Sequence, residues 1–350
     1  MSASMPACPR PWPRCARRWR SSRPRIRQKT RRKTRRRGET MKIGFIGLGT
    51  MGAFMAASLQ KSQYKLVVTD IRRDAAKRHL ENGAEWADTP KSVAEQCDIV
   101  FTSLPGPPDV EKVVFGADGL LAGAHAGMAY FDLSTNSQAM VRRVNAALAE
   151  KKAFGFDAPV SGGPKGAETG KLAIWVGGDK AVYEKHKKVL DAIGDQAAYI
   201  GPIGSASVAK LVHNMAGYAI QTALAEVFTM GTKAGMDPAA LWKAVRQGAQ
   251  GRRRTFDGLP RQFLVDKYTP PDFALRLAHK DVSLAVGLGR ELGVPMRLCN
   301  LVLEEMNEAR NRGWDDLDSR SPMKLQVERA GVTIKCDPAE LEKVLAADKG

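Results

Sequence analysis

The sequence predicts an α/β domain with a doubly wound sheet, followed by an all-α domain that is joined to it through a long helix. Between residues 41 and 203, short apolar strand patterns alternate with helical patterns, an order typical of a parallel sheet with helices on both faces. From residue 204 to 330 we find only helical periodicity, which opens with a long apolar stretch near Ser205. Residues 331–350 form a tail in which Asp337 and Pro338 precede a helical pattern over 339–345.

The first forty residues differ sharply in composition from the rest of the chain. Thirteen arginines and two lysines against a single acidic residue give residues 1–40 most of the net charge of +18. Their prolines and lack of apolar periodicity predict disorder. Three explanations remain open: a translation start assigned upstream of Met41, a transit peptide whose amphipathic helix the prolines disfavour, or a basic arm for nucleic acid or anionic surfaces.

The overall composition excludes several classes of protein. The chain is 43% hydrophobic and 26% charged, which is ordinary for a globular protein. Its most apolar span, residues 211–231, contains His213, Asn214, Gln221 and Glu226 and is expected to be a buried helix and not a membrane span. The five cysteines form no C-x-x-C pair, so we expect no disulfide framework, no metal site and a cytoplasmic location.

A glycine-rich turn follows the first predicted strand, Lys42–Ile46. It has the pattern G-x-G-x-x-G and leads directly into a helical pattern, after which a second strand pattern, 64–69, ends at Asp70. Such glycines allow a tight turn, close approach of the backbone to a pyrophosphate and close packing of helix on strand. The helix N-terminus then favours the phosphates. The sequence therefore predicts a Rossmann dinucleotide site at Gly47, Leu48, Gly49, Thr50, Met51 and Gly52.

The residue that ends the second strand indicates which dinucleotide is bound. A carboxylate at Asp70 can accept hydrogen bonds from the ribose hydroxyls and repels a 2′-phosphate, which favours NAD over NADP. Arg72 and Arg73 follow closely and could instead bind that phosphate, so NADP stays an alternative.

Further contacts are predicted where the later strands end. The strand patterns 98–104, 128–133 and 154–160 belong to the same sheet, and ligands bind at the carboxyl ends of such strands. This places Leu104, Pro105, Asp109, Ser134 and Thr135 against cofactor or substrate. Ser134 and Thr135 could also serve as the cap of the helix predicted from residue 138.

Candidate chemistry follows in three segments. A glycine-rich loop around Ser161 exposes backbone N–H groups that could hold a carboxylate, although a plain loop is equally consistent with its spacing. Lys210 and Asn214 share one face of an apolar helix, where a desolvated lysine can act as a general acid or base unless its amine reaches solvent. His213 reads as a packed helix residue, and His279-Lys280-Asp281 alone would be a solvated face.

Together these segments resemble the β-hydroxyacid dehydrogenase family, of which 3-hydroxyisobutyrate dehydrogenase is a member, over about residues 41 to 330. Four ordered motifs carry the resemblance: GLGTMG, the loop D-x-x-V-S-G-G-x-x-G-A-x-x-G from Asp157 to Gly170, the helix G-x-x-x-x-x-K-x-x-x-N, and K-D-x-x-L-A from Lys280. The resemblance implies that Lys210 is the catalytic proton donor and that Asn214 orients the substrate. It further implies that Ser161, Gly162 and Gly163 hold the substrate carboxylate, that Lys280 lies near the nicotinamide, and that the protein is a homodimer or homotetramer.

The implied reaction is hydride transfer between NAD and a small 3-hydroxy acid or its semialdehyde. The chain departs from the family at His213, where an asparagine is common, and in the basic run Arg252-Arg253-Arg254, which could hold a second substrate carboxylate or be a solvated loop. Glyoxylate, succinic semialdehyde or tartronate semialdehyde is an alternative substrate. An imine reductase and a non-catalytic nucleic-acid-binding relative are less favoured, because imine reductases usually replace the catalytic lysine and the nucleic-acid-binding relative lacks it.

Overall fold

The computed structural model describes residues 41–347 except 234, 249–253, 292 and 294–295. The expectations for residues 1–40 and for Arg252 and Arg253 fall outside the described residues, as does the side chain of Arg254. Among the described helices, none is both long and apolar enough to span a bilayer.

The sheet confirms the doubly wound arrangement that the sequence predicts. Its strand order is β3-β2-β1-β4-β5-β6-β8-β7, with β9 paired to β8, and the six strands from β3 to β6 pair in parallel. The sequence did not predict the edge beyond β6, where β8 runs antiparallel to both β6 and β7. The strands are β1 (Lys42–Ile46), β2 (Lys65–Thr69), β3 (Glu85–Trp86), β4 (Ile99–Thr102), β5 (Ala129–Asp132), β6 (Phe154–Asp157), β7 (Val160–Ser161), β8 (Ala173–Gly177) and β9 (Gln196–Gly201).

Both faces of this sheet are buried, which explains why its strands read as continuous apolar runs. On one face the rings of Phe101, Phe131 and Phe156 stack in sequence. On the other face Val100 and Tyr130 pack in a second core, because neighbouring strand residues point to opposite sides. The covering helices are α1 (Thr50–Lys61), η1 (Arg73–Ala76), α2 (Lys77–Glu81), α3 (Pro90–Gln96), α4 (Pro107–Phe115), α5 (Leu120–Gly123), α6 (Gln138–Glu150), α7 (Gly163–Thr169) and α8 (Lys180–Leu190).

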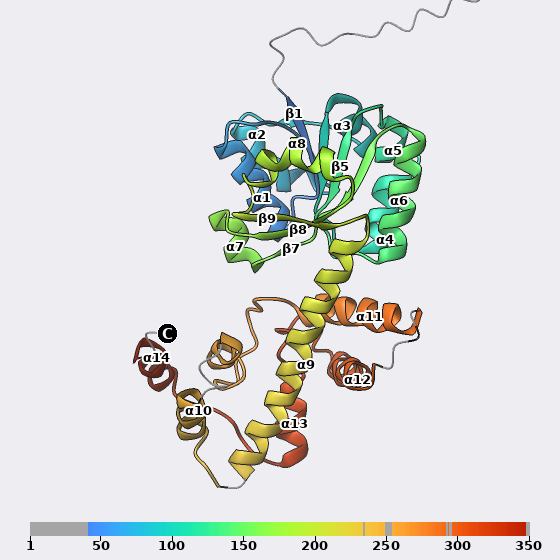
Figure 1. Cartoon of the computed structure of the whole chain (residues 1–350). Helices are drawn as coiled ribbons and strands as arrows, with labels where there is room; N and C mark the ends of the chain where they lie inside the picture. Colours follow the sequence, from blue (N-terminus) through green and yellow to red (C-terminus); the bar gives the residue numbers. More distant parts are fainter. Residues whose placement is uncertain (1–40, 234, 249–253, 292, 294–295, 348–350) are drawn as a thin grey trace, which may run out of the picture. The chain divides into compact units, whose positions relative to one another are not determined.

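A single long helix, α9 (Ser205–Lys233), connects the sheet to the helical part of the chain (Figure 1). It packs on β8 near its start and then against α10, α11, α12 and α13. The helix is therefore packed along one side, and the expectation of a buried helix is wrong for the other side, where Val212 and Ile220 are 63% and 42% exposed. The further helices are α10 (Pro238–Gln247), η2 (Arg254–Arg261), α11 (Leu275–Glu291), α12 (Arg297–Asn311), α13 (Met323–Ala330) and α14 (Pro338–Ala347).

The C-terminal tail is part of the helical core. Ile334 and Leu341 are 3% and 2% exposed and pack in one cluster with Trp242 and Phe263. The carboxylate of Asp337 accepts a hydrogen bond from the Ala339 amide at 3.0 Å at the start of α14. Burial of these side chains means that removing the tail would expose the cluster around Trp242 to water.

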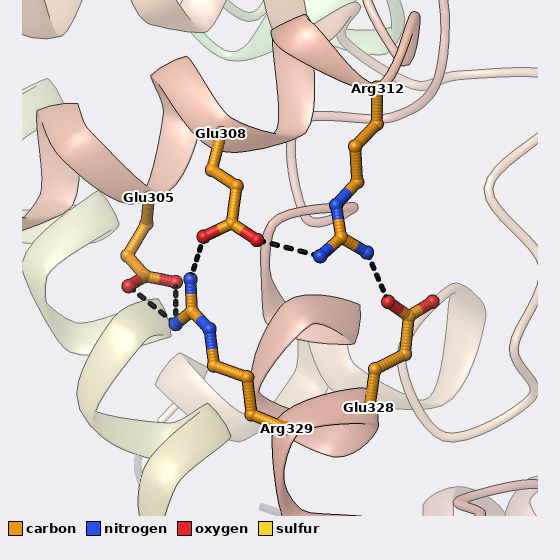
Figure 2. Close-up of polar contacts among 5 residues, drawn as sticks. All are labelled: Glu305, Glu308, Arg312, Glu328 and Arg329. Atoms are coloured by element: carbon orange, nitrogen blue, oxygen red, sulfur yellow. Dashed lines mark hydrogen bonds and ion pairs between the residues drawn. The ribbon is translucent and has the colours of Figure 1, made fainter.

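An ion-pair network fastens α13 to α12 (Figure 2). Glu308 joins two arginines, because its carboxylate accepts from Arg312 at 2.6 Å and also from Arg329. Arg329 further donates to Glu305 at 2.6 Å, and Arg312 to Glu328. These contacts lower the pKa of Glu308 and raise those of both arginines. The side chains are partly solvated, so each single ion pair contributes little to stability. The network supports the packing of α13 on α12 because several charges act together.

Candidate active site

The glycine-rich turn has the geometry that a dinucleotide needs. Gly47 lies at φ +92°, a conformation that side chains with a Cβ rarely adopt. A Cβ at Gly52 would lie 2.0 Å from the Gly47 carbonyl oxygen, so the first turn of α1 packs directly on the loop. By contrast, a Cβ at Gly49 would meet nothing within 4 Å. The N-terminus of α1, with Thr50 and Met51, therefore has open space in front of it where phosphate can approach.

Asp70 ties the end of β2 to this loop. Its carboxylate accepts from the Leu48 amide at 2.6 Å and from the Arg72 amide at 2.9 Å. Each carboxylate oxygen keeps a free lone pair, so the ribose hydroxyls could still donate to Asp70. Arg73 lies over the Trp86 ring at 5.3 Å. The side chain of the neighbouring Ile71 is fully exposed.

The ends of β4 and β5 are joined by a buried polar network. The Ser134 hydroxyl accepts from the Leu104 amide at 2.9 Å, and buried Asp132 accepts from Thr102 and Asn136 at 3.0 and 2.8 Å. The proposed capping role of Ser134 and Thr135 is wrong, because the N-cap of α6 is Ser137, which accepts from the Met140 amide at 3.2 Å. Half-buried Leu104, exposed Pro105 and half-buried Asp109 remain as predicted contacts on the β4 side.

Between α9 and α11 lie four residues of the candidate site: Lys210, Asn214, Lys280 and Asp281. The Asn214 amide donates to Asp281 at 2.5 Å, and the Lys280 ammonium lies 2.8 Å from the other oxygen of that carboxylate. Lys280 also donates to the Thr135 carbonyl at 3.3 Å. Burial lowers the pKa of Lys210, the carboxylate of Asp281 opposes this shift, and the ammonium of Lys280 adds to it.

The glycine-rich loop after β7 reaches the same helix. Gly162 and Gly163 have φ of +135° and +62°, so the turn needs both glycines. At its start, the Ser161 hydroxyl lies 3.2 Å from His213 Nε2 on α9. The structure thus brings Ser161 within one helical turn of Lys210, since His213 follows Lys210 by three residues.

Two carboxylates that support these residues were missed as site residues by the sequence analysis. Asp281 is 2% exposed and holds Asn214, and Asp157 is 1% exposed and accepts from the Gly204 and Ser207 amides at 2.8 and 2.7 Å. Both stood inside the quoted motifs, but nothing in a single sequence says which distant amides they bind. Among the described residues, no cluster of His, Cys, Asp and Glu could hold a metal ion.

Comparisons with known proteins agree with this geometry. Residues 42–201 match the NAD-binding domain of 6-phosphogluconate dehydrogenase, and residues 204–326 match the domain described as the NAD-binding domain of NADP-dependent 3-hydroxyisobutyrate dehydrogenase. The 2-(hydroxymethyl)glutarate dehydrogenase of Eubacterium barkeri is 33% identical over 296 residues, 85% of this chain and 98% of its own. Glyoxylate/succinic semialdehyde reductase 1 of Arabidopsis thaliana is 32% identical and covers 79% of this chain and 96% of its own.

A solved structure gives the same result for the fold. The 3-hydroxyisobutyrate dehydrogenase of Mycobacterium tuberculosis superimposes with a TM-score of 0.74 at 27% identity, over 82% of this chain and 99% of its own. Fold and comparisons together define an oxidoreductase that uses NAD or NADP and acts on hydroxy acids. Within that class, the chain belongs to the β-hydroxyacid dehydrogenase family.

Proposed function

We propose that this protein reversibly oxidises a small 3-hydroxy acid to its semialdehyde, with Lys210 as the general acid and base and NAD as the preferred cofactor. The observation that carries the proposal is the cluster of Lys210, Asn214, Lys280 and Asp281. Lys280 of this cluster also donates to the Thr135 carbonyl, which follows the end of β5. Desolvation lowers the pKa of Lys210 from its ordinary value, which makes its amine a better general acid and base.

The residues of the glycine-rich turn fit a dinucleotide. Open space at Gly49 and the free amides of α1 suit the pyrophosphate, and the carboxylate of Asp70 suits a ribose with two free hydroxyls. Bound there, NAD would supply the hydride acceptor for oxidation of the alcohol and, in its reduced form, the hydride donor for reduction of the aldehyde. The cofactor side of the site is then completed by Lys280, Leu104, Pro105, Asp109 and Thr135.

On the substrate side, each residue has one task. The neutral amine of Lys210 takes the proton of the substrate hydroxyl during oxidation, and the ammonium returns it to the carbonyl oxygen during reduction. Asn214, with its amide N–H group fixed by Asp281 at 2.5 Å, presents its remaining polar atoms to the hydroxyl. Ser161, Gly162 and Gly163 hold the carboxylate, because their loop directs a hydroxyl and backbone amides to one side.

The substrate is proposed to carry a second polar or acidic group. Two relatives at 32–33% identity are named for 2-(hydroxymethyl)glutarate and for glyoxylate/succinic semialdehyde, and the first of these is a dicarboxylate. The basic run that begins at Arg252 would supply guanidinium groups for such a group.

We also propose a cytoplasmic homo-oligomer. Val212 and Ile220 on α9 and Leu298 and Leu301 on α12 are large apolar side chains that are 42–63% exposed. Side chains of this kind on two helices are typical of a subunit interface. The cysteines in the described part of the chain are free thiols, which fits a reducing compartment.

The test is a screen of hydroxy acids of three to six carbons, with and without a second carboxylate, at saturating NAD or NADP. We expect turnover of at least one acid with NAD, and a loss of about 10²–10⁴-fold in kcat in Lys210→Ala. Cofactor affinity should stay within a few-fold, because the glycine-rich turn is untouched. Lys210→Arg should not restore the rate, since a guanidinium keeps its proton. Absence of turnover, or a folded Lys210→Ala enzyme that keeps a third of the rate, would refute the proposal.

A further inference from the structure

One contact of the site is not used by the mechanism above. His213 Nε2 lies 3.2 Å from the Ser161 hydroxyl, and the His213 ring lies against that of Trp175 with 5.3 Å between centroids and 56° between planes. The sequence singled out His213 as a departure from the asparagine that is common in the family. Here its imidazole reaches the serine that is proposed to hold the substrate carboxylate.

The partners of His213 are fixed by the sheet edge. Ser161 on β7 is the antiparallel partner of Ala173 on β8, and Trp175 follows two residues later. Residues two apart on a strand face the same side, so Trp175 lies on the face of β8 that Ala173 occupies beside Ser161. The imidazole arrives from α9 and contacts both. The strand pairing thus holds hydroxyl and indole at a set separation, and the ring of His213 bridges them.

The number of protons on the His213 ring and the Ser161 hydroxyl determines which hydrogen bonds Ser161 can make to a ligand. Burial and the nearby Lys210 lower the pKa of His213, so the ring is neutral at pH 7 and has one N–H group. If Nε2 accepted from Ser161, the only hydroxyl proton would point away from the ligand and leave lone pairs facing an anion. If Nε2–H donates to Ser161 Oγ, the hydroxyl proton stays available for a carboxylate oxygen.

We propose that His213 is a positioning residue for the substrate carboxylate: it rests on the Trp175 ring, donates from Nε2 to Ser161 Oγ, and thereby directs the Ser161 hydroxyl proton to the substrate. This inference rests on the proposed function, since it requires an anionic substrate group at Ser161. It predicts an effect on the binding of acids through Ser161 and little effect on the proton transfer at Lys210.

A double-mutant cycle on the full chain tests this, with the best hydroxy acid from the screen. His213→Phe keeps an aromatic ring on Trp175 but removes the donor, and Ser161→Ala removes the hydroxyl. Each should raise KM roughly tenfold or more, with kcat within about threefold, because the loss is in ground-state and transition-state binding alike. The double variant should be no worse than the poorer single variant. His213→Gln, whose amide can donate from a similar position, should restore KM to within about threefold of the parent.

The controls separate this role from a structural one. His125 lies at the opposite end of the sheet, where its Nε2 contacts the Cys97 carbonyl at 3.1 Å, and His125→Phe should leave KM unchanged. Should His213→Phe not fold, His213→Leu replaces it in the cycle. The inference would be overturned if the two single variants had multiplicative effects on KM, if KM were unchanged, or if His213→Gln did not restore it. In each of these cases, turnover by the parent enzyme would still uphold the proposed function. A parent enzyme without turnover would overturn both.

Discussion

Replacement of Asp281 by asparagine removes the charge of this side chain and keeps its size. The side chain is 2% exposed, accepts from Asn214 at 2.5 Å and pairs with Lys280 at 2.8 Å. Hydrogen bonds to charged groups contribute about 1.5–3 kcal/mol, and tenfold in rate corresponds to about 1.4 kcal/mol. Loss of this charge-assisted contact should therefore lower kcat by roughly 10–100-fold, provided that Asn214 orients the substrate as proposed.

The same variant should move the pH profile in a defined direction. Asp281 raises the pKa of Lys210 against the effect of burial, so its neutralisation should lower that pKa further. Oxidation of the alcohol needs the neutral amine, and kcat falls at low pH as the amine gains a proton. The acidic limb of the kcat profile should accordingly shift to lower pH in Asp281→Asn, even though its maximum is reduced.

Steady-state oxidation rates between pH 5 and 10 at saturating NAD and substrate provide the assay. Asp191→Asn is a matched control, because Asp191 pairs with Lys187 at 2.6 Å on the surface of α8 and is 40% exposed. The control should leave the limb in place. If Asp281→Asn lowers the rate but leaves the limb unmoved, or moves it to higher pH, the titrating group is not Lys210 under the influence of Asp281.

Three further outcomes follow from the same contacts. Lys280→Met should shift the acidic limb to higher pH, because the charge of Lys280 lowers the pKa of Lys210; a shift to lower pH would contradict this. Asp70→Ser should reduce the ratio of kcat/KM for NAD over NADP by about tenfold or more, and a parent enzyme that prefers NADP would refute the assignment. Gly52→Ala should weaken NAD binding at least about tenfold in a fluorescence titration, since its Cβ would lie 2.0 Å from the Gly47 carbonyl oxygen; unchanged affinity would contradict it.

The elements that the sequence predicted well are those whose signal is local. The strand 42–46 has the predicted bounds because an apolar run is followed directly by glycine. The long helix was predicted from Ser205 to 231 and runs to Lys233, since its apolar residues recur on a helical period over eight turns. The strand Ala173–Gly177 was missed, because its pairing with β6 and β7 depends on residues that lie distant in the chain.

The site residues divide in the same way into those with a local sequence signal and those without one. Lys210 and Asn214 could be placed together because residues four apart share a helix face. The contact of Asn214 with Asp281 spans 67 residues and that of Ser161 with His213 spans 52, so no spacing rule reveals them. The cap of α6 was assigned to the wrong residues although its signal is local: Ser137 directly precedes Gln138 and accepts from the Met140 amide, while Ser134 accepts from the distant Leu104 amide.

Asp157 explains how the glycine-rich loop after β7 and the helix α9 keep one alignment. It ends β6, four residues before Ser161, and its two carboxylate oxygens accept from the Gly204 and Ser207 amides at the start of α9. Burial raises the pKa of Asp157, while these amide donors act in the opposite direction and favour the carboxylate; the helix N-terminus favours the negative charge as well. A serine or threonine in this place would offer one acceptor oxygen, whereas Asp157 offers a separate oxygen to each amide. Because one buried carboxylate accepts from two amides at the start of α9, it holds the end of β6 against the helix that carries Lys210.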